Sequence, residues 1–156
     1  MQQAHKRLLI FATILVWTTL FTQPLRAGVT VNQAFTWGTI GMTDNNSPSS
    51  LTVLTNGSTI VTGSIVQITP AEPGIFRITE LPPNTSISSI TVGVISPMQR
   101  GASEVFTTDN FIVDHPASAT GRNLDITIGG RLLTTGSGTG YIDGLYGTTL
   151  ELTINF

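Results

Sequence analysis

The C-terminal segment of the chain alternates strictly between apolar and polar side chains. Its apolar members are Leu150, Leu152, Ile154 and Phe156. Side chains of an extended strand point alternately to opposite faces, so these four residues share one face and the polar residues between them share the other. We therefore expect this segment to form a β-strand within a sheet, with its apolar face against a core.

Similar short runs, rich in β-branched residues, recur along the chain and are separated by Gly, Pro, Asn and Ser. No segment after residue 27 has a sustained helical period. This pattern is typical of an all-β sandwich or barrel. The expected strands are 29–37, 51–55, 59–68, 75–81, 86–95, 104–106, 110–114, 123–134 and 150–156.

Two glycine motifs predict local backbone geometry within this framework. Asn56-Gly57 lies between two strand-like runs and predicts a tight hairpin turn. Gly129-Gly130 lies inside the run 123–134 and predicts a bulge or a close approach of another backbone. Because no internal repeat and no linker divides the sequence, we expect a single domain over residues 28–156.

Residues 1–27 have the pattern of a secretory signal peptide. A basic start precedes the apolar run Leu8–Phe21, and the segment 24–27 resembles a cleavage region. The alternative is an uncleaved membrane anchor, but an apolar run of 14 residues is short beside the ~20 that a spanning helix needs. We expect cleavage near Ala27, export to the periplasm and cell surface, and contact with the membrane only during secretion.

Charge and composition exclude several classes of function. After cleavage, four arginines would stand against nine acidic residues, giving a net charge of −5. A mildly acidic surface without a basic cluster argues against nucleic acid or anionic membranes as partners. The expected mature chain contains no cysteine and no lysine, which excludes disulfides, thiol nucleophiles and Schiff bases.

Catalytic and metal-binding motifs are absent from the expected mature sequence. His115 is its single histidine, and no serine lies in a Gly-x-Ser-x-Gly nucleophile elbow. One histidine without cysteine is a poor basis for a zinc site. The sequence therefore predicts a protein that is not an enzyme and that has no catalytic residues, cofactor or metal.

The aromatic residues divide into expected core and one candidate ligand contact. Trp37 and Tyr146 lie on the apolar phase of their runs, which favours burial. Tyr141 follows the glycine-rich segment 136–140 and is the most open of the three. It is the candidate for stacking against a glycan.

Three motifs, in this order along the chain, carry a resemblance to a known family. They are Phe-Thr-Trp-Gly-Thr-Ile at 35–40, Ile-Gly-Gly-Arg-Leu at 128–132, and Gly-x-Tyr-x-Thr-x-Leu-x-Leu-x-Ile-x-Phe at 144–156. The last resembles the C-terminus of archaic chaperone–usher pilins and spore-coat-U-like proteins, with Thr148 where that family usually has aspartate. Together the motifs resemble a domain family of unknown function whose members are cysteine-free, secreted, pilin-like bacterial proteins.

This resemblance implies an immunoglobulin-like, pilin-like β-sandwich that serves as a structural subunit of a surface filament or coat. In such systems a missing strand is supplied first by a periplasmic chaperone and then by a neighbouring subunit, so the implied partners are a chaperone and other copies of the chain. The implied donor-strand residues are Val29, Val31, Phe35 and Trp37. The implied C-terminal assembly strand carries Tyr146, Leu150, Leu152, Ile154 and Phe156.

Two other functions remain open from the sequence. Only residues 28–34 precede the Phe-x-Trp-Gly motif, which is short for a donor strand, so a self-contained module that binds carbohydrate or a surface is the alternative. A terminal phenylalanine on alternating apolar residues also resembles the export signal of outer-membrane barrels. A small barrel is the third hypothesis, although residues 28–156 contain only eight aromatic residues for its girdles.

Overall fold

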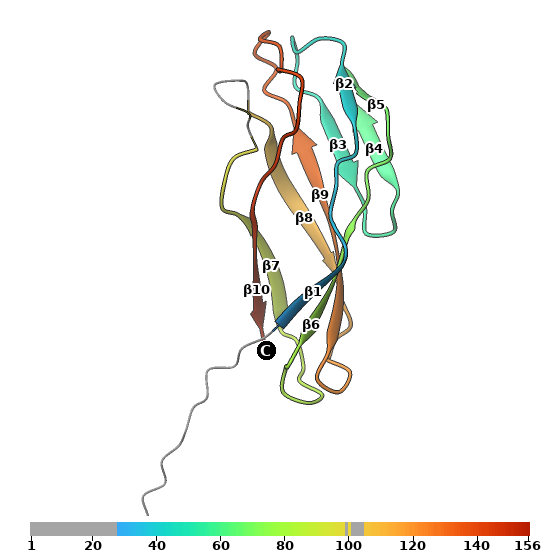
Figure 1. Cartoon of the computed structure of the whole chain (residues 1–156), viewed down its shortest axis with the longest axis vertical. Helices are drawn as coiled ribbons and strands as arrows, with labels where there is room; N and C mark the ends of the chain where they lie inside the picture. The colour runs from blue at the N-terminus through green and yellow to red at the C-terminus, as the bar shows by residue number, and fades with distance from the viewer. Residues whose placement is uncertain (1–27, 99, 101–104) are drawn as a thin grey trace, which may run out of the picture.

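The computed structural model describes residues 28–98, 100 and 105–156. The predicted signal peptide lies outside these residues. Within them the chain is all-β, with ten strands and no helix (Figure 1). The strands are β1 (Gly28–Gln33), β2 (Ile40–Met42), β3 (Ser50–Val53), β4 (Thr59–Thr62), β5 (Ile65–Gln67), β6 (Gly74–Thr79), β7 (Ser89–Val94), β8 (Thr107–Asp114), β9 (Leu124–Leu133) and β10 (Leu150–Asn155).

The long strand β9 organises a six-stranded antiparallel sheet with the path β1-β6-β9-β3-β4 and with β8 also paired to β9. β6 pairs with residues 124–128 of β9, and β3 pairs with residues 130–133. β8 pairs with both of these parts, so it occupies the opposite edge of β9. One edge of β9 therefore changes partner at Gly129.

The two glycines of β9 allow this change of partner. A Cβ on Gly129 would collide with the carbonyl oxygen of Val53, where β3 ends. A Cβ on Gly130 would lie 2.8 Å from the ring of Phe111. The close backbone approach predicted from the Gly-Gly pair is confirmed at Gly129.

Two small sheets complete the fold, β7 with β10 and β2 with β5. The apolar side chains form two clusters. The first cluster surrounds Trp37, Leu51 and Leu132, and the second surrounds Ile78, Leu124 and Ile126. Side chains of β7 and β10 pack on the second cluster, which makes a two-layered arrangement at the end of the molecule where both β1 begins and β10 ends (Figure 1).

Some strand boundaries differ from the sequence-based prediction. The run 59–68 forms two strands with different partners, because Gly63 adopts a φ of 73° and the chain turns there. The predicted strand 110–114 begins earlier, at Thr107, since β8 continues through a bulge between Asp109 and Ile112. The hairpin turn at Asn56-Gly57 is confirmed, with the Gly57 amide donating to the carbonyl oxygen of Leu54.

A buried asparagine fixes the glycine-rich segment 136–140. The Asn45 side-chain amide donates to the hydroxyl of Thr135 at 3.0 Å and to the carbonyl oxygen of Thr139 at 2.7 Å. Its side-chain oxygen accepts from the amide of Gly136 at 3.0 Å. The glycine-rich segment is therefore held to the loop after β2, and these bonds occupy the side chain of Asn45, which lies in an Asn-x-Ser pattern.

Candidate assembly groove

β10 and β7 pair over six residues without a register shift. Leu152 lies opposite Val92 and Ile154 lies opposite Ile90, so these four side chains share one face. Burial along β10 alternates as the sequence predicts, with Leu150, Leu152 and Ile154 more buried than the residues between them. None of the three is fully buried, although Leu152 and Ile154 pack on the second cluster.

On β1 the apolar side chains of the core side are more exposed than those of β10. Val29 lies opposite Ile78, which is 1% exposed, and Val31 lies opposite Phe76. Directly opposite residues share a face of the sheet, so Val29 and Val31 point to the core side. They are nevertheless 59% and 56% exposed. The core side of β1 thus carries two valines that no other part of the described chain covers.

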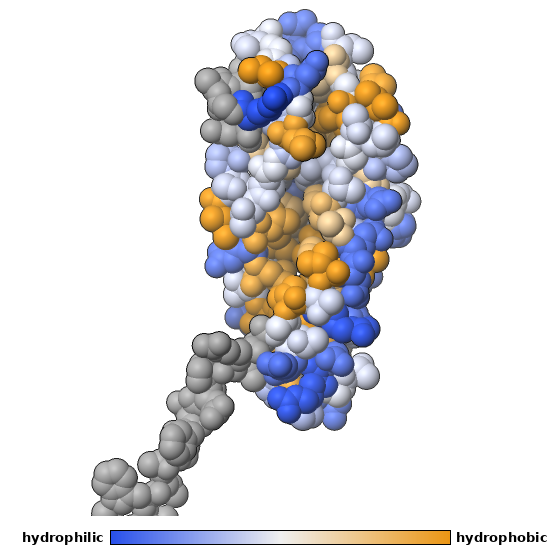
Figure 2. All heavy atoms as spheres, in the orientation of Figure 1, coloured by the Kyte–Doolittle hydropathy of each residue, from blue (hydrophilic) through white to orange (hydrophobic). Residues whose placement is uncertain are grey.

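An apolar hollow lies between these two strands. Figure 2 shows it as a recessed hydrophobic strip between β10 and β1. In the described chain β1 pairs only with β6 and β10 pairs only with β7, so each strand has a free edge. We call this feature the β1–β10 groove; it is lined by Val29, Val31, Leu150, Leu152 and Ile154.

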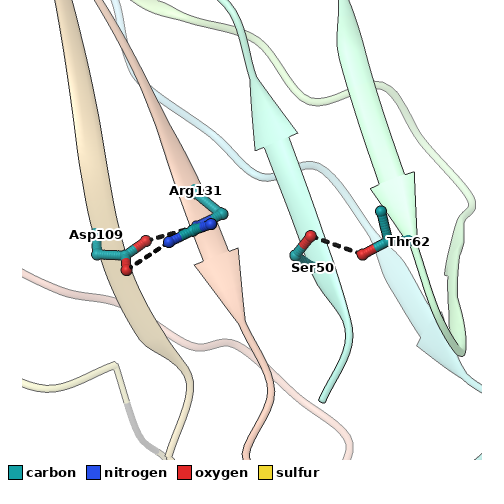
Figure 3. A network of polar contacts seen from close by, with 4 residues as sticks. All are labelled: Ser50, Thr62, Asp109 and Arg131. Carbon is teal, nitrogen blue, oxygen red and sulfur yellow. Dashed lines mark hydrogen bonds and ion pairs between the residues drawn. The ribbon is translucent and has the colours of Figure 1, made fainter. Parts of the chain in front are cut away.

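The charged groups of the large sheet lie on its outer face, away from the groove. Arg77, opposite Thr30 of β1, forms a bidentate pair with Asp125 at 2.7 and 2.8 Å. Arg131 pairs in the same way with Asp109 at 2.9 Å, in the region where Ser50 and Thr62 also share a hydrogen bond (Figure 3). Hydrogen bonds from the guanidinium groups lower the pKa of Asp125 and of Asp109 below the usual aspartate value.

The four candidate donor residues do not lie on one continuous strand. Val29 and Val31 belong to β1 and pair with β6 of the same chain. Phe35 and Trp37 follow β1 and form an edge-to-face pair in the first cluster, with ring centroids 4.6 Å apart. All four are used within the chain's own domain, so donation of this segment would require β1 to leave β6.

The candidate C-terminal residues lie in two places. Leu150, Leu152 and Ile154 are on β10, and Phe156 follows it with 54% of its surface exposed. Tyr146 precedes the strand and packs edge-to-face on Phe106 of the first cluster. Its hydroxyl donates to the carbonyl oxygen of Ile142 at 2.8 Å. Tyr146 therefore anchors the loop before β10 and does not line the groove.

Tyr141, the candidate glycan contact, already stacks on a protein ring. Its ring lies 4.0 Å from that of Phe106, nearly parallel. Its hydroxyl accepts a hydrogen bond from the amide of Thr135 at 3.0 Å. One face of the ring is thus occupied within the molecule.

The sequence pattern predicts the apolar face of β10 but not the side of β1 that is left uncovered. The alternation of Val29 and Val31 was visible, whereas their exposure depends on which strand lies above them. His115 is on the loop after β8, with its Nδ1 2.8 Å from the carbonyl oxygen of Pro116. Among the described residues, no three His, Asp or Glu side chains gather in a way that could hold a metal ion.

Comparison of the chain with family models, with curated proteins and with solved structures finds no match. In the part of the chain that the structure describes, no helix is long and apolar enough to span a membrane. The geometry of the groove is therefore the main basis for a functional proposal.

Proposed function

We propose that this chain is a secreted structural subunit of a bacterial surface filament or coat, and that subunits join by β-strand addition in the β1–β10 groove. The observation that carries the proposal is the exposure of Val29 and Val31 on the core side of the sheet. Contiguous apolar surface beside an unpaired strand edge is the arrangement to which an added strand binds.

The strand layout supports an immunoglobulin-like sandwich from which one strand is missing. Such a sandwich has strands A, B, E and D in one sheet and C, F and G in the other. In chain order β1, β6, β7, β8, β9 and β10 take the places of A to F, because β1-β6-β9-β8 form one layer and β7-β10 the other. No strand of the described residues takes the place of G, which would pair with the free edge of β10 and cover β1.

The energetics favour filling this position. Full burial of a valine side chain contributes about 1.5–3 kcal/mol, so covering the exposed half of Val29 and of Val31 contributes about 1.5–3 kcal/mol in total. Main-chain hydrogen bonds to the free edges of β1 and β10 add to this contribution. An added strand therefore contributes a few kcal/mol, against a total stability of about 5–15 kcal/mol for a small domain.

The shape of the groove restricts the occupant. The groove is bordered by the free edges of two strands, and an extended segment is the kind of occupant that pairs with such edges. We infer that the occupant is a single extended segment, supplied by a neighbouring copy of the chain in the assembled form. A periplasmic chaperone would supply an equivalent strand before assembly.

The assembly is tested by gel electrophoresis of the secreted protein with and without boiling, together with light scattering. We expect a ladder of oligomers that collapses to one band on boiling. Val31→Asp places a charge in the groove at an already exposed position, and it should abolish the ladder while leaving a folded monomer.

Thr30→Asp is the matched control, because Thr30 is the adjacent residue of β1 and lies opposite Arg77 on the outer face. This variant should retain the ladder. A wild-type protein that stays monomeric, or a ladder that survives Val31→Asp, would contradict strand addition in this groove.

A further inference from the structure

The seam between β7 and β8, on the other side of the two layers, is closed at both ends. Ser86 bridges to Ser118 at one end, and Met98 bridges to Phe106 at the other. The chain segments from 86 to 98 and from 106 to 118 have equal length, so the two bridges belong to one antiparallel register. The amide of Ile87 donates to the carbonyl oxygen of Ala117 in that register.

Between these bridges the two strands separate. β7 pairs only with β10 and β8 only with β9 among the described residues, and a cavity of about 420 Å³ opens between them. We call it the β7–β8 window. Its apolar lining includes Ile90, Val92 and Phe111, and its polar lining includes Thr91, Thr108 and Asn110.

The polar lining consists of groups that are available to a ligand. Within the described part of the chain, the side chains of Thr91, Thr108 and Asn110 make no hydrogen bond. Thr108 lines the window and is 9% exposed. The facing edges of β7 and β8 also present main-chain groups that no strand pairs.

One of the three described non-glycine residues with positive φ lies at the window. Asn110 lies in the bulge of β8 and adopts a φ of 49°, a conformation that is uncommon for residues other than glycine. Bulges redirect side chains, and strained residues occur more often at binding sites than elsewhere.

The window carries no net charge. Among the described residues that line it, Asp109 alone is charged, and its carboxylate is neutralised by the bidentate pair with Arg131. The walls therefore combine aliphatic side chains, one aromatic ring, the hydroxyl group of Thr108 and the carboxamide of Asn110. Neutral hydrogen-bonding groups beside an apolar surface suit a neutral polyhydroxylated ligand that has an apolar face.

We propose that the β7–β8 window binds a neutral mono- or disaccharide unit of a glycan. The closed ends exclude a strand that runs through the seam, in contrast to the β1–β10 groove. An acyl chain would leave the hydroxyl and amide groups of the wall unpaired. A volume of about 420 Å³ is within the range of small-ligand sites. The subunit would thus carry an adhesive site separate from its assembly site.

The test uses isotope-labelled protein purified from the periplasm and NMR titration with lactose, maltose and N,N′-diacetylchitobiose. At about 10 mM, a site with a Kd of about 1 mM is about nine-tenths occupied. At least one of the three disaccharides should shift resonances of residues on β7 and β8 that line the window. The absence of shifts with all three, or shifts confined to other regions, would overturn the proposal.

Asn110→Gly provides a variant that keeps the fold, because glycine adopts positive φ without strain. It removes the carboxamide and should weaken binding at least tenfold. Asn84→Gly is the matched control, since Asn84 also has a positive φ, of 54°, and lies on the loop between β6 and β7 outside the window. Unchanged affinity in Asn110→Gly, or equal loss in both variants, would contradict the proposed site.

Discussion

Replacing Gly129 by alanine should lower the free energy of unfolding by about 3 kcal/mol, the upper range for adding one carbon to a packed interior. The added Cβ would collide with the carbonyl oxygen of Val53, and its next neighbours are main-chain atoms of Leu54 and Thr55. Backbone at the junction of β3 and β9 cannot rotate away as a flexible side chain can. Urea denaturation followed by circular dichroism measures the change.

Gly93→Ala is the control for this prediction. Gly93 also lies in a strand, but a Cβ there meets no atom within 4 Å. Alanine should raise stability slightly, by about 0.5–1 kcal/mol, because glycine loses more backbone entropy on folding. Equal effects at the two positions would mean that β3 does not approach β9 as closely as described.

The second large effect is expected at Leu124, which is fully buried in the second cluster. Leu124→Ala should reduce the free energy of unfolding of the monomer by about 2–5 kcal/mol through lost burial and a residual cavity. Leu152→Ala should cost the monomer clearly less, because Leu152 lies in the groove and is only partly buried. Denaturation of monomeric protein separates the two variants.

Assembly should raise the cost of Leu152→Ala relative to the cost of Leu124→Ala. If a strand from a neighbour covers β10, Leu152 becomes buried only in the oligomer, whereas Leu124 is buried in both states. Leu152→Ala should therefore weaken the oligomer more than it weakens the monomer. Equal costs of the two substitutions in the monomer would indicate that β10 is already covered, which contradicts an open groove.

The sequence predicted faces of strands more reliably than their ends. The alternation at 150–155 identified the buried face of β10, and Asn56-Gly57 identified a hairpin, because both signals are local. The division of the run 59–68 was missed, since the turn at Gly63 depends on contact with Ser49, whose hydroxyl accepts from the amide of Ser64. Ser49 lies outside the run, so the pattern of residues 59–68 could not predict the turn.

The candidate site was predictable only in part for the same reason. Val29 and Leu152 were recognised as apolar members of alternating segments, but a pattern does not show which face lacks a cover. Trp37 has the pattern of a strand residue, yet the chain leaves β1 before it and buries it in the first cluster. The β7–β8 window lies where two strands share a register at their ends and separate in the middle. No pattern in the sequence predicts that separation.

Amide hydrogen exchange of the assembled and the dissociated protein shows whether β10 receives a strand from another molecule. We expect the amides of β10 to gain protection on assembly. Amides of β4, which lies at another end of the large sheet, serve as an internal reference and should not change. Equal protection of β10 in both states would contradict strand addition at this edge.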